Sequence, residues 1–301
     1  MNTKKLHRGV IVPMSTPFTP TGEVDEAGAE RIADRLARHQ LSVFVLGTTG
    51  ETSSIPVAQR ERVVQAAVRA AAGRVPVYAG IGDNCLADSV SAGRRYLRHG
   101  VAAVVAHMPC YYPIGEAEMH EYFKQLHDGL NGPLMLYNIP QTTRMSLPLD
   151  VVERLSTLTN VVGFKDSEST PGRLEEVARR FGGRPNFSIL IGVAALGLTA
   201  LRAGFDGLIP SSGNLVPELW EKFWNAAEQR NWSEVEALQK QLDEIAAVLQ
   251  RNRGLGGYLA ALKAALAAQK LCTRTVLPPL RSLPEKEEQE VIAGLSALHV
   301  L

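Results

Sequence analysis

The sequence is poor in cysteine, and its three cysteines form no recognisable pattern. Cys85, Cys110 and Cys272 lie far apart, without CxxC or Cys–His spacing. An odd, widely spaced set argues against a disulfide framework and against a structural zinc site. We therefore expect a reduced protein that needs no metal.

Long apolar runs and excess charge are also missing. Residues 1–14 contain no apolar stretch of signal-peptide length, and no segment approaches the length of a transmembrane helix. The 301 residues include 32 basic and 31 acidic side chains, intermixed and without a basic stripe. This composition argues against nucleic acid and anionic membranes as partners and predicts a cytoplasmic protein.

A glycine-rich phosphate-binding turn is absent after the first apolar run, which continues into Ser15-Thr16-Pro17-Phe18. That absence counts against a doubly wound open sheet, the main structural alternative. Short apolar runs alternate with amphipathic segments, which is typical of βαβ units with a parallel sheet. About eight units are what a closed (β/α)8 barrel requires, and we predict that fold. The runs are Gly9–Met14, Ser42–Leu46, Pro76–Ala79, Ala102–Ala106, Leu134–Tyr137, Val161–Phe164, Ser188–Ile191 and Asp206–Ile209.

The pattern of strands stops at Pro217, and only helical segments follow. We predict a barrel domain of residues 1–216 and a C-terminal helical extension of residues 217–301. The extension would pack on the barrel or form a subunit contact. Its second helix is amphipathic, with apolar residues near helical spacing at Val235, Leu238, Leu242, Ile245 and Leu249.

Polar residues at the carboxyl ends of barrel strands are the first candidates for catalysis. Lys165 directly follows the run Val161–Phe164. Burial there would lower the pKa of the lysine and make its amine a nucleophile. A structural pairing with Asp166 is the alternative. Tyr137 ends the preceding run and could carry a proton, although packing on the barrel rim is the better explanation of a tyrosine taken by itself.

Two loops add to this set. The turn Gly47-Thr48-Thr49-Gly50-Glu51 offers hydroxyl and backbone N–H groups that could hold a carboxylate. The loop after the fourth run carries Tyr111 and Tyr112. Each signal by itself also fits a purely structural turn or loop. Because all of them follow predicted strands, one pocket would gather them.

These motifs resemble the dihydrodipicolinate synthase and N-acetylneuraminate lyase family of class I aldolases. GTTGE at Gly47–Glu51, GDN at Gly82–Asn84, YNIP at Tyr137–Pro140 and GFKDS at Gly163–Ser167 match that family in order and separation. The resemblance runs from about Gly9 to Pro279. It implies a barrel enzyme that works without a metal or an organic cofactor.

The resemblance also implies roles for individual residues. Lys165 would form a Schiff base with a 2-oxo acid, usually pyruvate, and Tyr137 would relay protons. Thr48 and Thr49 would bind the carboxylate, and Thr48 would link Tyr137 to a second tyrosine. Tyr112 matches that second tyrosine, which a neighbouring subunit supplies in the synthase branch. The remaining matches are to pocket-lining positions, at Gly192 and Ile209.

Departures from the family pattern bear on the substrate. The synthase branch carries an arginine two residues after the YNIP proline, where this chain has Thr142, and Arg144 stands where glycine is usual. The loss of a bidentate carboxylate clamp counts against the synthase reaction. The apolar stretch Gly192–Ala195 lacks the acidic residues that a sialic acid would need.

We therefore expect an aldolase that forms or cleaves a 2-keto-3-deoxy sugar acid or a similar 4-hydroxy-2-oxo acid. The sequences Lys-Asp-Ser at 165–167 and Ser-Ser-Gly-Asn at 211–214 favour this branch. The alternatives are dihydrodipicolinate synthesis from pyruvate and aspartate semialdehyde, another Schiff-base lyase or dehydratase reaction, and a non-catalytic 2-oxo-acid sensor. The expected partners are a small 2-oxo acid, an aldehyde and further copies of the chain, as a homotetramer or dimer.

Overall fold

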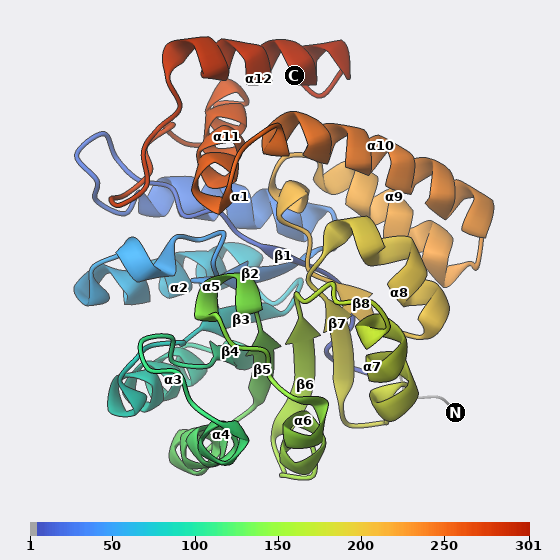
Figure 1. Ribbon diagram of the computed structural model, residues 1–301. Helices are drawn as coiled ribbons and strands as arrows, with labels where there is room; N and C mark the ends of the chain where they lie inside the picture. Colours follow the sequence, from blue (N-terminus) through green and yellow to red (C-terminus); the bar gives the residue numbers. More distant parts are fainter. Residues whose placement is uncertain (1–4) are drawn as a thin grey trace. The chain divides into compact units, whose positions relative to one another are not determined.

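The computed structural model describes residues 5–301, and its centre is a closed barrel of eight parallel strands in sequence order. Each strand is followed by helical structure, as Figure 1 shows. The predicted (β/α)8 barrel is thus confirmed, and the doubly wound sheet is not adopted. The strands are β1 (Gly9–Pro13), β2 (Ser42–Val45), β3 (Val77–Gly80), β4 (Ala103–His107), β5 (Leu134–Asn138), β6 (Val161–Asp166), β7 (Ser188–Ile191) and β8 (Gly207–Leu208).

The strands form where short apolar runs can be buried on both faces of the sheet. Nearly every strand residue is buried, including all of β1, β2, β3, β5 and β7. Three of the strands extend beyond the apolar runs into polar residues. β4 ends at His107, β5 at Asn138 and β6 at Asp166. These extensions carry polar side chains at the carboxyl ends of adjacent strands.

The chain groups into two compact units. The first comprises the chain up to Ile11 together with Val77–Pro210. In Figure 1 its helices α3 (Leu86–Arg98), α4 (Glu116–Leu130), α6 (Leu149–Leu155) and α7 (Arg173–Phe181) lie outside the strands β3 to β7. Short helices α5 (Pro140–Thr143) and α8 (Gly197–Ala203) follow β5 and β7.

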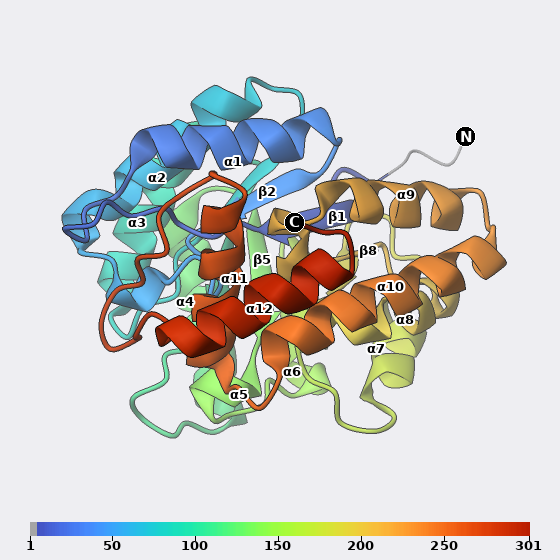
Figure 2. The ribbon, with the colours of Figure 1, turned by 90° about the horizontal axis from the view of Figure 1, so that it is seen from above.

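The second unit comprises Val12–Pro76 and Ser211–Leu301. It holds α1 (Glu26–Arg38), α2 (Val57–Ala71), α9 (Pro217–Glu228), α10 (Trp232–Gln250), α11 (Leu255–Ala268) and α12 (Glu285–Ala297). Figure 2 shows α12 crossing α11 and running beside α10. Asp25 caps the N-terminus of α1, because its side chain accepts a hydrogen bond from the N–H of Gly28 at 2.9 Å.

The C-terminal helices bury their apolar faces. All five predicted apolar residues of α10 are buried, which confirms its amphipathic pattern. Trp220 of α9 is fully buried, and its indole Nε1 donates to Ser212 Oγ at 3.0 Å. The predicted boundary between residues 216 and 217 stays a prediction. Over residues 5–301, no helix combines the length and the apolar character needed to cross a bilayer.

Candidate active site

Lys165 and Tyr137 lie side by side at the carboxyl ends of β6 and β5. The two residues are register partners in the parallel ladder. Lys165 Nζ lies 3.8 Å from the centroid of the Tyr137 ring, and each residue is only 4% exposed. The structure thus brings the predicted nucleophile and the predicted proton carrier into direct contact within one unit.

The environment of Lys165 favours an uncharged amine. Burial lowers the pKa of Lys165, and the nearby Tyr137 phenol acts in the opposite direction without reversing the shift. Water cannot solvate the ammonium form in this position, so a larger fraction of the lysine is uncharged at a given pH. A deprotonated primary amine is the form that attacks a carbonyl carbon.

Asp166 belongs to a separate polar network. Its Oδ2 lies 2.7 Å from Arg173 Nε, and its Oδ1 accepts a hydrogen bond from Asn138 Nδ2 at 2.8 Å. Glu168 joins the network because its Oε2 also accepts from Asn138 Nδ2, at 2.8 Å. Burial raises the pKa of Asp166, although the Arg173 guanidinium opposes that shift. Other groups therefore occupy both Asp166 oxygens, which argues against the alternative in which Lys165 merely pairs with Asp166.

His107 is a site residue that the sequence interpretation missed. It ends β4 and is the register partner of Tyr137. The two rings meet edge to face, with centroids 6.4 Å apart. Its position in the sequence could have identified it, because His107 directly follows the apolar run Ala102–Ala106 as Lys165 follows Val161–Phe164.

The two predicted pocket-lining residues lie at the ends of the next strands. The backbone N–H of Gly192 donates to Asp166 O at 2.7 Å, directly after β7. A Cβ atom at Gly192 would lie 2.0 Å from Ser167 Oγ, so a larger residue here would have to displace the Ser167 side chain. Ile209 is buried directly after β8, and its N–H donates to Ile191 O at 2.8 Å.

Tyr112 lies on an exposed loop that a side chain from the GDN motif holds in place. Asn84 Oδ1 accepts hydrogen bonds from the N–H groups of Cys110 at 2.9 Å and Tyr111 at 3.2 Å. Tyr111 and Tyr112 are 76% and 72% exposed, and their rings meet edge to face at 5.0 Å. The structure of the single chain therefore leaves the Tyr112 phenol facing outward.

The region where the synthase branch has its arginine is also exposed. Thr142 lies on α5, and its Oγ1 donates to Ile139 O at 3.2 Å. Arg144 directly follows this helix with a φ of 61°, in the left-handed region. A side chain in this conformation costs backbone strain, which glycine would avoid.

The GTTGE turn belongs to the second unit, where a buried ion pair anchors it. Within the turn, the N–H of Glu51 donates to Thr48 O at 3.1 Å, and Thr49 is buried. Glu51 Oε1 lies 2.9 Å from Lys263 Nζ, with the two side chains 1% and 0% exposed. Glu51 Oε2 also accepts from the N–H of Leu277 at 2.9 Å. The carboxylate-binding roles of Thr48 and Thr49 stay predictions.

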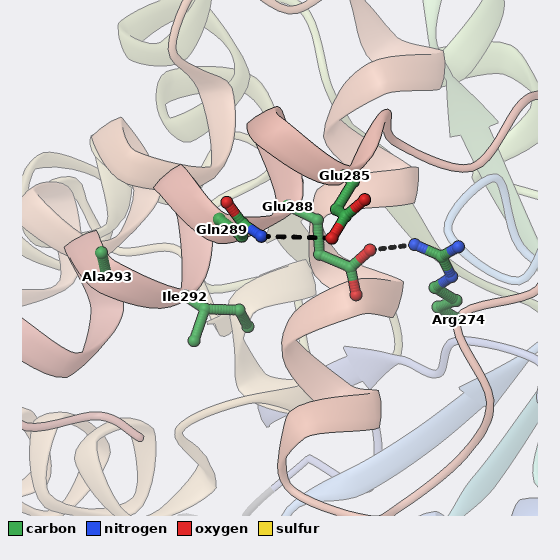
Figure 3. A pocket seen from close by; sticks show the side chains of 6 residues that line it. All are labelled: Arg274, Glu285, Glu288, Gln289, Ile292 and Ala293. Atoms are coloured by element: carbon green, nitrogen blue, oxygen red, sulfur yellow. Dashed lines mark hydrogen bonds and ion pairs between the residues drawn. The ribbon is translucent and has the colours of Figure 1, made fainter.

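A cavity of about 570 Å³ opens among the C-terminal residues of the same unit, as Figure 3 shows. Its polar side chains are already paired with one another. Arg274 forms an ion pair with Glu288, and Gln289 donates to Glu285 at 3.3 Å. No lysine, tyrosine or histidine lines the cavity. It therefore offers no group for Schiff-base or proton-transfer chemistry.

The chain is similar to known proteins over nearly its whole length. A model of the dihydrodipicolinate synthetase family matches residues 6–298. A probable 2-dehydro-3-deoxy-D-pentonate aldolase of Escherichia coli is 29% identical, and the alignment covers 99% of both chains. Among solved structures, dihydrodipicolinate synthase from Bacteroides thetaiotaomicron superimposes with a TM-score of 0.91 at 30% identity, covering 96% of this chain and 98% of the other.

A second solved structure carries a relevant ligand. An Escherichia coli K12 prophage protein of the dihydrodipicolinic acid synthase family, solved in complex with pyruvate, gives a TM-score of 0.91 at 26% identity. The similarity covers 98% of this chain and 100% of that one. These matches cover the whole barrel. The chain belongs to the dihydrodipicolinate synthetase family, whose members are Schiff-base-forming lyases.

Proposed function

We propose that this protein is a pyruvate-dependent aldolase that forms or cleaves a 2-keto-3-deoxy sugar acid or a similar 4-hydroxy-2-oxo acid. The observation that carries the proposal is the contact between Lys165 and Tyr137. A buried amine with a lowered pKa lies over a phenol at the carboxyl ends of neighbouring strands. Barrel enzymes place their reacting groups at this end of the strands.

The chemistry follows from these two groups. The Lys165 amine adds to the C2 carbonyl of pyruvate and water leaves, which produces an iminium ion. The iminium accepts electrons, so C3 can lose a proton and become an enamine nucleophile. The enamine carbon then bonds to the aldehyde carbon, and the aldehyde oxygen takes up a proton that the Tyr137 phenol can deliver. Hydrolysis of the new iminium returns free Lys165, and the reverse sequence cleaves the product.

Two relatives support pyruvate and a sugar-derived partner. One is named as a probable 2-dehydro-3-deoxy-D-pentonate aldolase, and another was solved with pyruvate bound. Thr142, short and neutral, replaces the arginine that would clamp the carboxylate of aspartate semialdehyde. Thr48 and Thr49 would hold the carboxylate of pyruvate, and Gly192 and Ile209 would line the pocket.

Borohydride trapping tests this proposal directly. Incubation with pyruvate followed by reduction should fix one pyruvate unit on the protein, and peptide mass spectrometry should locate it on Lys165. The same experiment separates an enzyme from a non-catalytic 2-oxo-acid sensor, because binding without an imine leaves nothing to reduce. An adduct on another lysine, or no adduct, would contradict the assignment.

Replacing Tyr137 by Phe should reduce turnover by roughly two to four orders of magnitude, the usual worth of a positioned acid or base. The ring and its contact with Lys165 Nζ remain, so the variant should fold normally, as circular dichroism can check. Steady-state kinetics with a saturating 2-keto-3-deoxy acid gives the measurement. Turnover within a factor of a few of the wild type would remove Tyr137 from the proton path.

The substrate itself is decided by comparing two specificity constants. We expect kcat/KM for cleavage of 2-keto-3-deoxygluconate to exceed that for condensation of pyruvate with aspartate semialdehyde. Arg144 is exposed two residues after Thr142 and could restore carboxylate binding, which keeps the synthase reaction as the second candidate. A semialdehyde reaction that is tenfold faster would establish the synthase activity instead.

We further propose that the protein is a cytoplasmic homo-oligomer in which Tyr112 reaches a neighbour's site. Two adjacent tyrosines that are more than 70% exposed form the kind of aromatic surface that interfaces cover. Light scattering should give the mass of a dimer or a tetramer rather than 32.7 kDa. In that case Tyr112→Phe should lower turnover, whereas Tyr111→Phe serves as the matched control. A fully active monomer would refute this role.

A further inference from the structure

His107 lies in the same row of the sheet as the two proposed catalytic residues. In the parallel ladder His107 pairs with Tyr137, and Tyr137 pairs with Lys165. Register partners on neighbouring strands carry their side chains on the same face of the sheet. The edge-to-face contact between the rings of His107 and Tyr137 agrees with this placement. The imidazole therefore lies on the same face of the sheet as Tyr137 and Lys165.

One nitrogen of the imidazole has a fixed role. His107 Nδ1 lies 2.7 Å from the backbone carbonyl oxygen of Met108. A carbonyl oxygen only accepts hydrogen bonds, so Nδ1 must carry a proton and donate it. In the neutral ring Nε2 then has no proton and presents a lone pair. The backbone thus sets the tautomer, and the second nitrogen is left as a hydrogen-bond acceptor.

Gly82 provides the room for this ring. A Cβ atom at Gly82 would lie 2.4 Å from His107 Nε2, well inside van der Waals contact. Any larger residue would displace the imidazole, so the glycine of the GDN motif and His107 fit each other. This complementarity indicates that the orientation of the ring is built into the adjoining loop.

The charges around His107 favour the neutral ring. Burial lowers the pKa of His107, and Lys165 lowers it further, while the Met108 carbonyl and Asp83 act in the opposite direction. The net shift is downward from an ordinary value of 6.5. Near pH 7 the imidazole therefore acts as an acceptor at Nε2 and not as a cation.

Resting on the proposed aldolase function, we propose that His107 determines specificity by accepting, at Nε2, a hydrogen bond from a hydroxyl group of the aldehyde-derived part of the substrate. A hydroxyl can donate to this lone pair. A carboxylate or a plain aldehyde oxygen only accepts, and would face the lone pair unfavourably. His107 thus favours a hydroxylated aldehyde over one that ends in a carboxylate or a methyl group.

The test compares two aldehydes of equal carbon number in condensation with pyruvate. The wild type should give a higher kcat/KM with glyceraldehyde than with propionaldehyde, which lacks the hydroxyl groups. In His107→Asn the side-chain amide can still donate to Met108 O, but nothing replaces Nε2. The glyceraldehyde-to-propionaldehyde ratio should fall about tenfold or more, which corresponds to one lost hydrogen bond. His107→Gln places its amide near the Nε2 position and should retain a larger part of the ratio.

Because each variant is compared with itself on two aldehydes, a general loss of activity does not affect the result. A ratio unchanged in His107→Asn, including equal loss with both aldehydes, would overturn the specificity role. So would a His107→Gln variant with a ratio no higher than that of His107→Asn. Pyruvate trapping of the wild type is a separate measurement of the Schiff-base proposal. A trapped wild type with an unchanged ratio therefore rejects His107 alone, whereas an untrapped wild type rejects the proposed function.

Discussion

Replacing Lys165 by Met should abolish aldol turnover while making the folded protein more stable. The variant removes the only proposed nucleophile, so kcat should fall by about four orders of magnitude or more. Methionine keeps the length and the apolar stem of lysine but has no amine to desolvate. Lys165 is buried and its pKa is lowered, so burying its amine costs folding free energy. Catalysis requires this amine, and the variant without it should therefore be more stable. Enzyme assays and thermal unfolding measure the two effects.

The pH dependence of stability gives this prediction a second readout. The unfolded chain holds a proton on Lys165 up to an ordinary pKa of 10.5, whereas the folded protein releases it at lower pH. Between these two pKa values the unfolded state binds more protons, so raising the pH stabilises the wild type. Lys165→Met should lack this gain in the alkaline range. The difference in unfolding free energy between wild type and variant should therefore shrink as the pH rises.

Lys124→Met is a matched control for the Lys165 variant. Lys124 is exposed on α4 and pairs with Asp128 at 2.6 Å, one turn away. Such a surface pair contributes little, so both turnover and thermal stability should stay near wild type. If Lys165→Met kept substantial turnover, or if pyruvate could still be trapped on it, another lysine would have to be the nucleophile.

Replacing Lys263 by Met should destabilise the protein by about 3–5 kcal/mol, the usual result of removing one partner of a buried ion pair. Glu51 would remain buried without its cation. The ammonium group also donates to Thr16 O at 2.6 Å and Thr275 O at 2.9 Å, and both carbonyls would lose this donor. Urea unfolding monitored by circular dichroism measures the change in free energy.

A double variant separates the buried charge from general packing. Lys263→Met combined with Glu51→Gln leaves no uncompensated carboxylate, so it should be less destabilised than Lys263→Met alone. A loss below about 1 kcal/mol in the single variant would mean that water or a rearranged side chain solvates Glu51. If the double variant were the less stable of the two, the ion pair would not be the source of the effect.

The barrel could be predicted from the sequence because its strands are apolar on both faces. The strand Ser188–Ile191 was predicted with its observed bounds, whereas Val161–Phe164 was predicted two residues short of the observed end at Asp166. The extension continues because the backbone of β6 still pairs with β5, and ladder hydrogen bonds do not depend on side-chain polarity. Apolar runs therefore locate the strands, but they do not reveal the polar residues at the carboxyl ends.

The sequence identified Lys165 and Tyr137 as candidates because each lies at the end of an apolar run. Their position alone left structural roles open, and it was the resemblance of the surrounding motifs to the family that implied their chemistry. His107 could not be assigned in this way, because its proposed role depends on its register pairing with Tyr137 on the adjacent strand and on the space beside Gly82. Lys263 was also beyond prediction, since its partner Glu51 lies more than two hundred residues earlier in the chain.

The position of the buried Trp220 has a spectroscopic consequence. All three tryptophans of the chain, Trp220, Trp224 and Trp232, lie on the neighbouring helices α9 and α10. Trp220 is shielded from water, so the emission of the folded protein should be shifted toward the blue and should move to the red when these helices separate. An optical signal from these indoles therefore reports the integrity of α9 and α10.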